Sequence, residues 1–396
     1  MQAYMDNAAT TQMSKEAREA MLLTAEEYYG NPSSLHSVGQ RAKEKLEEAR
    51  GIVAACLGAE PNEIYFTSGG SESDNQAILS AAKVGMRKGK KHIVTTAFEH
   101  HAVLHTLAKL EKEGFEVTYL PVGREGNIAA SDLAAALRED TCLVTVMTAN
   151  NEIGSVLPIA EIGAICRERK VLFHTDAVQA VGHIPVNVKE MQADMLSLSA
   201  HKFHGPKGVG VLYARRGVAL SSLIEGGAQE QGKRAGTENL PGIVALSVAI
   251  REAVDHLSEN AARVGGMRDR LIEGLSAIPH SVLNGDKICR LPGNVHFCFE
   301  GIEGESLLLL LDECGVQASS GSACTSGSLD PSHVLLAIGH PHEIAHGSLR
   351  LSLSEYTTEE EIDLALDAVP KVVERLRNMS PIWRDKINGR KPFLLK

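Results

Sequence analysis

The sequence of 396 residues lacks the marks of several protein classes. No apolar run approaches the roughly 20 residues of a membrane helix, and the first residues lack the basic-then-apolar pattern of a secretory signal. We therefore expect a cytoplasmic protein without membrane contacts. Acidic residues outnumber basic ones by 50 to 40, and the resulting formal charge of −10 argues against direct binding of nucleic acid.

The seven cysteines are odd in number, widely scattered and never spaced Cys-x-x-Cys, which disfavours a disulfide framework or a zinc knuckle. Cys324 differs from the others because it lies in the small polar run 319–328, where no apolar residue could anchor it. We expect this run to be mobile and Cys324 to be an accessible, reactive thiol. The other cysteines fit buried small side chains, although Cys289 has no clear context.

Short β-rich runs alternate with helical patterns between about residues 60 and 215, which predicts a mostly parallel sheet covered by helices. Strands are expected at 64–67, 93–95, 117–120, 143–147, 171–174, 195–198 and 209–213, and helices at 36–57, 72–88, 101–113, 131–139 and 158–169. After Gly242 the pattern stays helical to about residue 277. It then changes to a strand near 294–299, a loop and a closing helix at 357–377, which predicts a separate α+β domain.

Ligands of open α/β sheets bind beyond the carboxyl ends of the strands, and small residues follow the first predicted strand there. The run Ser68-Gly69-Gly70-Ser71 opens a helix whose backbone N–H groups would face a phosphate. An ordinary helix cap explains this run about as well. No Gly-Lys-Ser/Thr follows, and Gly-x-Gly-x-x-Gly is absent, so neither a P-loop nor a dinucleotide fingerprint is present.

Two later strand ends carry residues that suit the same ligand. Asp176 can pair with a protonated pyridinium nitrogen, or it can cap the next helix. Lys202 lies between a strand end and a Gly/Pro-rich turn, where loss of water lowers a lysine pKa as imine formation requires. Most lysines lie on the surface. The order of phosphate-type loop, aspartate and lysine nevertheless predicts a pyridoxal phosphate site.

Two histidine pairs have the four-residue spacing of helical metal ligands: His101 with His105, and His342 with His346. No zincin-type glutamate lies between the members of either pair. We therefore favour chance pairs in a chain with 16 histidines over a metal site.

Stretches along the whole chain resemble the cysteine desulfurases of the aminotransferase class V group, in the branch that serves iron–sulfur cluster and nitrogenase cofactor supply. The matching stretches are DNAATT at 6–11, GNPSS at 30–34, FTSG at 66–69, ESDN at 72–75, EH at 99–100, NNEIG at 150–154, DAVQ at 176–179, SAHK at 199–202, SSGSAC at 319–324 and RLSL at 350–353. The resemblance implies the fold type I of pyridoxal phosphate enzymes. It places a large α/β domain with a mostly parallel seven-stranded sheet at residues 15–257. A small α+β domain of residues 1–14 and 258–396 would carry the catalytic cysteine loop at about 319–330.

The resemblance also implies the residues that hold the cofactor. Lys202 would bind the aldehyde of pyridoxal phosphate covalently, Asp176 would pair with the ring nitrogen, and His100 would stack on the ring. Side-chain amides would bind the phenolic oxygen and its surroundings, and small polar groups would bind the phosphate. These further residues are Asn151 and Gln179 for the ring, and Gly70, Ser71, Ser199, His201 and Thr237 for the phosphate. Thr237 would reach across from a second subunit, which implies a homodimer.

The implied reaction removes sulfur from L-cysteine, releases L-alanine and leaves a persulfide on Cys324, with Lys202 and His100 as acid–base groups. The substrate would be bound by Arg350 through its carboxylate, together with Asn31 and Asn151. The implied sulfur acceptor is an iron–sulfur scaffold protein, and a thiolation pathway for transfer RNA or cofactors is the alternative. No metal site of the chain's own is implied, although Cys324 is a candidate for an iron–sulfur ligand shared with a scaffold.

Rival functions stay open on the sequence. A selenocysteine lyase or another class V enzyme would use Lys202 and Asp176 without a mobile cysteine, and a cofactor-free scaffold would only dock sulfur acceptors. The tail from Trp383 to Lys396 is locally basic. It could dock an acidic partner, but we favour a solvated end.

Overall fold

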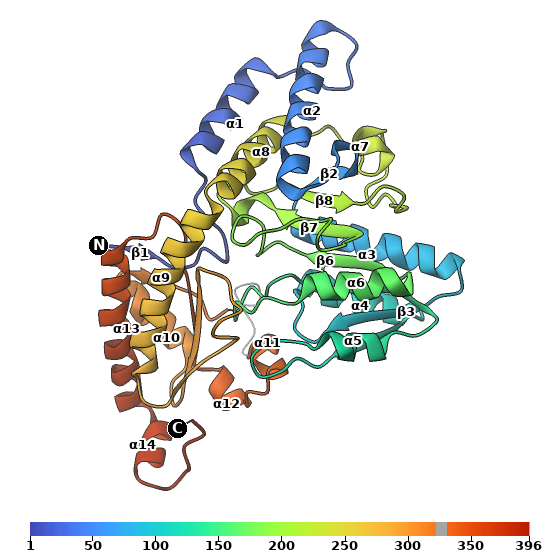
Figure 1. Cartoon of the computed structure of the whole chain (residues 1–396). Helices are drawn as coiled ribbons and strands as arrows, with labels where there is room; N and C mark the ends of the chain where they lie inside the picture. The colour runs from blue at the N-terminus through green and yellow to red at the C-terminus, as the bar shows by residue number, and fades with distance from the viewer. Residues whose placement is uncertain (322–330, 396) are drawn as a thin grey trace.

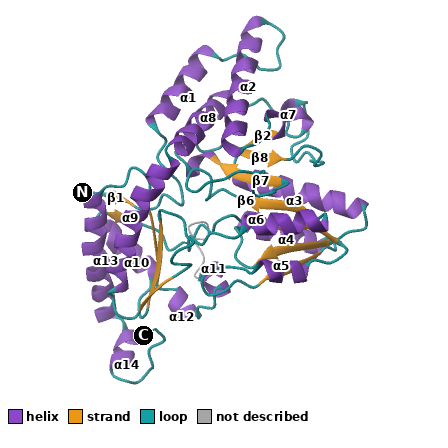
Figure 2. Cartoon of the chain, viewed as in Figure 1, coloured by secondary structure: helices purple, strands orange, loops and turns teal. Residues whose placement is uncertain are grey.

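The computed structural model describes residues 1–321 and 331–395. Its centre is a seven-stranded sheet in the order β2-β8-β7-β6-β5-β3-β4 (Figures 1 and 2). The strands are β2 (Ile64–Thr67), β3 (His92–Thr96), β4 (Glu116–Leu120), β5 (Thr141–Thr145), β6 (Leu172–Asp176), β7 (Met195–Ser199) and β8 (Gly210–Ala214). All neighbours are parallel except β8, which runs antiparallel to β2 and β7. The predicted mostly parallel α/β sheet is confirmed.

Helices cover both faces of this sheet, and successive residues of a strand belong alternately to two separate apolar clusters. Val94 and Val144 belong to one cluster, whereas Ile93 and Leu143 belong to the other. This alternation is the two-residue period of a strand buried on both faces. The helices of this part are α1 (Lys15–Glu27), α2 (Ser37–Leu57), α3 (Gly70–Arg87), α4 (His101–Lys112), α5 (Ala130–Ala136), α6 (Ile159–Arg169), α7 (Gln229–Gly232) and α8 (Leu240–Asp255).

The second part of the structure has a hydrophobic core of its own, to which both chain ends contribute. Ala3 and Met5 pack there with residues between Val264 and Val373. Its elements are β1 (Ala3–Tyr4), α9 (Leu257–Ser276), β9 (Ser281–Leu283), β10 (Asn294–Phe299), α10 (Gly304–Glu313), β11 (Val316–Gln317), α11 (His333–Ala337), α12 (His342–Ala345), β12 (Ser348–Ser352), α13 (Glu359–Met379) and α14 (Pro381–Ile387). The domain boundaries at residues 15 and 257 stay a prediction.

The helical stretch expected from Gly242 to about residue 277 is confirmed as α8 and α9, which are separated where the chain leaves helical geometry at His256. One sequence prediction in the second part was wrong. The loop expected after β10 contains α10, which the Glu303 carboxylate caps by accepting from the Glu305 and Ser306 amides. Leu307 and Leu311, one helical turn apart, bury that helix against the core.

Residues 6–14 run from the second core to the sheet, and they fix the two parts near one point. The Asn7 amide donates to the Ser352 carbonyl on β12 (3.3 Å). A few residues later the Thr11 amide donates to the His201 carbonyl (2.9 Å), and the Ser14 amide donates to the His204 carbonyl (2.9 Å). The segment therefore brings backbone from the N-terminus directly under the turn that carries Lys202.

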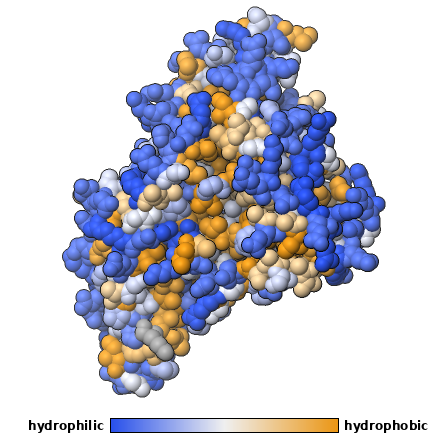
Figure 3. All heavy atoms as spheres, viewed as in Figure 1, coloured by the Kyte–Doolittle hydropathy of each residue, from blue (hydrophilic) through white to orange (hydrophobic). Residues whose placement is uncertain are grey.

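Hydrophilic side chains cover most of the face shown in Figure 3, and apolar ones gather toward its centre. Every helix among the described residues is too short or too polar to cross a bilayer.

Cys142, Cys166 and Cys298 are buried as predicted, whereas Cys289 and Cys314 are exposed, so burial was the wrong expectation for these two.

The basic C-terminal tail is anchored at two buried residues, Lys386 and Leu395, although most of its described residues, with Arg384, Arg390 and Lys391 among them, are exposed as predicted. Lys386 is 3% exposed, and its Nζ lies 2.6 Å from Glu300 Oε1 and 2.9 Å from Glu343 Oε1. The backbone amides of Leu394 and Leu395 donate to the fully buried Glu300 carboxylate, each at 2.8 Å. A buried carboxylate requires such partners, and the charge pattern alone gave no sign of it.

Replacing Lys386 with alanine is expected to lower the free energy of unfolding by about 3 kcal/mol, because it leaves the Glu300 charge buried without its cation. Urea denaturation followed by circular dichroism measures this change. Lys391→Ala, at an exposed position of the same tail, is the matched control and should alter stability by less than about 0.5 kcal/mol. Equal effects of the two variants would contradict the structural role given to Lys386.

Candidate active site

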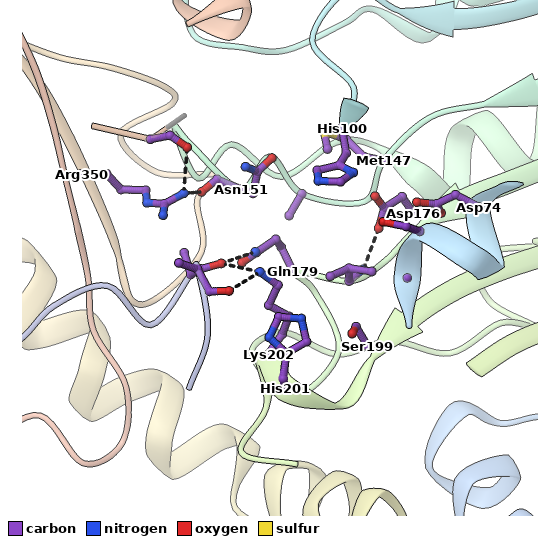
Figure 4. A pocket seen from close by; sticks show the side chains of 17 residues that line it. Asp74, His100, Met147, Asn151, Asp176, Gln179, Ser199, His201, Lys202 and Arg350 are labelled. Carbon is purple, nitrogen blue, oxygen red and sulfur yellow. Dashed lines mark hydrogen bonds between the residues drawn. The ribbon is translucent and has the colours of Figure 1, made fainter. Parts of the chain in front are cut away.

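A cavity of about 290 Å³ opens beyond the carboxyl ends of β5, β6 and β7, the position expected for a ligand of an open α/β sheet (Figure 4). Its walls come from α3, from the strand ends, from the N-terminal segment and from the second core. The lining residues are Ala8, Ala9, Gly70, Ser71, Asp74, His100, Met147, Ala149, Asn151, Asp176, Val178, Gln179, Ser199, His201, Lys202, Gly321 and Arg350.

Lys202 extends into the cavity from a short 3-10 turn, Ala200–Lys202, that follows β7. Its Nζ donates to the carbonyls of Ala8 (2.7 Å) and Ala9 (2.8 Å) in the N-terminal segment. Gln179 Nε2 donates to the same Ala8 carbonyl (2.9 Å). The backbone of residues 8–9 thus holds the amine at the cavity wall, where half-burial limits its access to water.

Asp176 ends β6 and faces the cavity at 6% exposure. Its Oδ1 accepts from the Val178 amide (2.9 Å). Burial raises the pKa of Asp176 to about 6, while that hydrogen bond and the Lys202 charge act in the opposite direction. The carboxylate is therefore available as an anion near neutral pH and can bind a cationic ring nitrogen.

His100 is the N-cap of α4, where its Nδ1 accepts from the Ala102 amide (3.1 Å). This contact leaves the proton of the neutral ring on Nε2. Burial, followed by the charges of Lys202 and His333, lowers the pKa of His100 to about 4. An uncharged, planar imidazole consequently lines the cavity at neutral pH, which suits stacking and proton exchange through Nε2.

The N-terminus of α3 forms the end of the cavity beside β8. A Cβ on Gly70 would lie 2.5 Å from Val178 Cγ2, and a Cβ on Gly210 would lie 2.5 Å from the Gly69 Cα. Only glycine permits this close packing of loop, helix start and strand. The first-turn amides of the 18-residue helix have no intrahelical acceptors, so this end of the cavity is suited to an anion.

Arg350 lies on β12 at the opposite end of the view in Figure 4 from Asp74 and Asp176. Its guanidinium is 1% exposed and donates to the Asn151 carbonyl (2.9 Å), the Gly321 carbonyl (3.3 Å) and Asp6 Oδ1 (2.9 Å). Among the described residues, no group accepts from its buried Nε. A fixed guanidinium with donors to spare suits a small carboxylate ligand.

One potential metal-ligand atom from each of Asp74, His100 and Asp176 lies within 4.8 Å of the other two. Such spacing also occurs in metal sites. Lys202 opposes that use, because its positive charge acts on both His100 and Asp176 inside the same cavity. The combination favours an organic ligand with a cationic nitrogen over a metal ion.

A family model described as aminotransferase class-V matches residues 3–365. The chain belongs to this family. Cysteine desulfurase IscS of Methanosarcina thermophila is 56% identical over 379 residues, which cover 96% of this chain and 94% of that protein. A solved structure titled NifS-like protein aligns with a TM-score of 0.89 at 40% identity, covering 95% of this chain and all of the other. Another, titled SspA in complex with cysteine, aligns with a TM-score of 0.79 at 38% identity, covering 90% and 100%.

Most of the residues that the class V resemblance singled out line this one cavity, although their individual roles stay predictions. Thr237 and Asn31 do not line it, and both are exposed. Cys324 lies outside the described residues. The described residues on either side of the gap are anchored nearby: Ser320 accepts from Ser348 Oγ (3.0 Å) through its carbonyl, and His333 contacts the Glu99 carbonyl (3.0 Å).

Sequence reasoning missed several residues that shape this class V site. The Ala8 and Ala9 carbonyls hold Lys202, Asp6 pairs with Arg350, and Asp74 is a second buried acid beside Asp176. Asp6 and Asp74 belong to stretches that matched the family, DNAATT and ESDN, so a signal was present without a role. Ala8 and Ala9 belong to the same DNAATT stretch, but residue type could not indicate their role, because any residue supplies a backbone oxygen.

Proposed function

We propose that this chain is a pyridoxal-phosphate-dependent cysteine desulfurase that converts L-cysteine to L-alanine and carries the sulfur as a persulfide on Cys324. The observation that carries the proposal is the convergence of Lys202, Asp176, His100 and Arg350 on one cavity with a helix N-terminus. The names of the relatives, cysteine desulfurase and NifS-like protein, support the same reaction.

The residues present fit the cofactor. Its phosphate would lie at the N-terminus of α3, with Ser71, Ser199 and His201 beside it, and its aldehyde would meet Lys202. Asp176 would hold the ring nitrogen, and the uncharged His100 would stack on the ring. The amides of Gln179 and Asn151 would bind the phenolic oxygen and its surroundings. One end of the cavity suits an anion, and an acid lies beside it, so the distribution of charge matches the phosphate and the ring nitrogen of this cofactor.

Once bound, pyridoxal phosphate supplies an electron sink for the substrate's α-carbon. Arg350 binds the substrate carboxylate and fixes the α-carbon relative to Lys202, whose Nζ takes the α-proton as a base. His100 Nε2 exchanges a proton with the reacting groups. Asn31 is proposed as a further substrate contact.

The Cys324 thiolate attacks the substrate sulfur, so that an S–S bond forms while the substrate's C–S bond breaks and its β-carbon takes up a proton. Cysteine and the enzyme thiol thus give alanine and an enzyme persulfide, with atoms and electrons balanced. Gly321 lines the cavity and lies three positions before Cys324 in the sequence, which supports Cys324 as the nucleophile. The fully buried Cys298 has a pKa raised to about 12 by burial and is unsuited to that role.

The proposed active form is a homodimer in which Thr237 contacts the cofactor phosphate in the second subunit. Thr237 is exposed and does not line the cavity of its own subunit. Seven residues earlier the chain is fixed to the sheet: Arg50 forms a bidentate ion pair with Glu230 (2.8 Å), and Glu230 also accepts from the Phe66 amide (2.8 Å). An exposed hydroxyl that follows this anchored position suits a contact across an interface.

The persulfide sulfur is proposed to pass to an iron–sulfur scaffold protein, with Cys324 as a candidate ligand shared with the growing cluster and no resident metal in this chain. Transfer RNA or cofactor thiolation is the second candidate route. The reaction would take place in the cytoplasm, without direct nucleic-acid or membrane contacts.

The test is alanine formation by the purified holoenzyme from L-cysteine, with selenocysteine and with keto acids plus an amino donor as parallel substrates. Alanine and reducible sulfur in equal amounts from cysteine support the desulfurase. Turnover of selenocysteine alone would identify a selenocysteine lyase, and transamination alone would identify an aminotransferase. The absence of all three activities would favour the scaffold without catalysis.

Arg350→Lys is expected to raise the KM for L-cysteine by about 10- to 100-fold with a smaller change in kcat, because one ammonium replaces a planar, bidentate donor. Steady-state alanine assays measure both constants. Arg375→Lys, at an exposed position on α13, is the matched control and should leave KM unchanged. An unaltered KM in Arg350→Lys would remove Arg350 from substrate binding.

A further inference from the structure

A polar patch lies on the sheet beneath α3, beside the apolar cluster that contains Ile93 and Leu143. His174 on β6 contacts Thr145 Oγ1 on β5 through Nδ1 (2.8 Å) and Ser197 Oγ on β7 through Nε2 (2.9 Å). All three side chains are fully buried. His174 and Asp176 are two residues apart on β6, so they face the same side of the sheet.

Asp74 projects from the second turn of α3 onto this patch at 1% exposure. Its Oδ1 lies 3.6 Å from His174 Nε2, and among the described residues no donor satisfies that oxygen. Asp74 and Asp176 each place a carboxylate oxygen within 4.8 Å of the other and of His100 (Figure 4). Two buried acids therefore share one wall of the cavity. A single cationic ring nitrogen could balance the negative charge of only one of them.

The two acids have unequal surroundings. Asp176 accepts from the Val178 amide and feels the Lys202 charge, and both favour its ionised form. Asp74 faces the Asp176 carboxylate, whose negative charge disfavours ionisation of Asp74, and the Ser197 hydroxyl gives only partial relief. Burial first, and then Asp176, raises the pKa of Asp74 well above its usual value.

Three other titratable side chains near the pair, all among the described residues, are mostly uncharged near neutral pH. Burial raises the pKa of Glu99 to about 8, lowers the pKa of His174 to about 3 and lowers the pKa of His100 to about 4. Among the described residues, Lys202 is the cation that acts on the pair, and it acts on Asp176. Like charges at this separation in a buried site do not both form, so one proton has to reside on the pair.

We propose that Asp74 is a positioning residue that keeps this proton as a neutral carboxylic acid and so leaves Asp176 as the single carboxylate facing the ring nitrogen of the cofactor. The role toward the ring nitrogen rests on the proposed function, whereas the location of the proton does not. Asp74 acts through Asp176 and is not itself required to touch the substrate.

Infrared spectroscopy of the apoenzyme tests the proposal without any reaction. Isotope-labelled aspartate separates the carboxyl bands of aspartates from those of Glu99 and other glutamates. We expect one buried, protonated aspartate at neutral pH. Asp74→Asn is expected to remove that band. Asp176→Asn is expected to keep it and to shift its titration to lower pH, because the neighbouring negative charge is gone.

The opposite pattern, in which Asp176→Asn removes the neutral-pH band and Asp74→Asn leaves it, would overturn the proposal. So would the absence of any protonated aspartate band in the unsubstituted apoenzyme at neutral pH, a result that needs no variant to fold. Failure of the proposed desulfurase function would instead appear as missing alanine from cysteine with these infrared signals intact, so the two failures are distinguishable.

Discussion

Cys324→Ala is expected to abolish alanine release from L-cysteine, by at least about a thousandfold, while the cofactor stays bound, because the variant has no thiolate to accept the sulfur. Lys202, Asp176 and the α3 N-terminus, which are proposed to hold the cofactor, are untouched by this change. The visible absorbance of the cofactor should therefore match that of the unmodified enzyme, and only the turnover assay should differ.

Cys289→Ala and Cys314→Ala are the matched controls, since both remove an exposed cysteine elsewhere on the surface. Each should retain full alanine release. Normal turnover by Cys324→Ala would show that the sulfur leaves by another route, and loss of turnover in Cys289→Ala or Cys314→Ala would transfer the nucleophile to that residue.

Lys202→Ala should also reduce alanine release by at least about a thousandfold, for a different reason: it removes the amine that would bind the aldehyde and take the α-proton. Borohydride treatment should attach the cofactor irreversibly to the unmodified enzyme and not to the variant. The carbonyls of Ala8 and Ala9, which accept from Nζ, would lose their donor.

Lys207→Ala is the control for this second change, because Lys207 is an exposed lysine in the stretch that follows the same turn. Its activity and borohydride labelling should match the unmodified enzyme. Irreversible labelling of Lys202→Ala, or of Lys207 in the unmodified enzyme, would contradict the assignment of Lys202.

The sheet could be predicted from the sequence because its central strands are buried on both faces and therefore form short apolar runs. Asp176 and Lys202 could be located for a related reason. Both follow such runs, and in parallel sheets the carboxyl ends of strands meet at one edge. The residues of the site were thus within reach of pattern reasoning, even though their spacing in the sequence is wide.

Contacts between distant segments could not be predicted. The N-terminal strand β1 pairs with β11, more than three hundred residues later, and only this folding brings the Ala8 carbonyl to Lys202. Nothing in the residues around Lys386 distinguishes it from an exposed tail lysine. In the structure it is buried in an ion pair with Glu300, which lies 86 residues earlier in the sequence. Such pairings depend on tertiary geometry, which local periodicity does not encode.

The exposure of Cys289 and Cys314 shows a limit of the same kind. Cys314 follows the helical run of α10 and was expected to be buried, but it is the C-cap of that helix and faces outward. Residue type predicts average burial, whereas the position within the last turn of a helix decides it for one side chain.

A single-turnover experiment tests the central claim most directly. Holoenzyme is mixed with a substoichiometric amount of L-cysteine in the absence of reductant, alanine is quantified, and thiols are alkylated before peptide mapping by mass spectrometry. The proposed function predicts alanine equal to the cysteine added, with one extra sulfur atom on the peptide that contains Cys324. Alanine without a persulfide on that peptide, or a persulfide located on another cysteine, would contradict it.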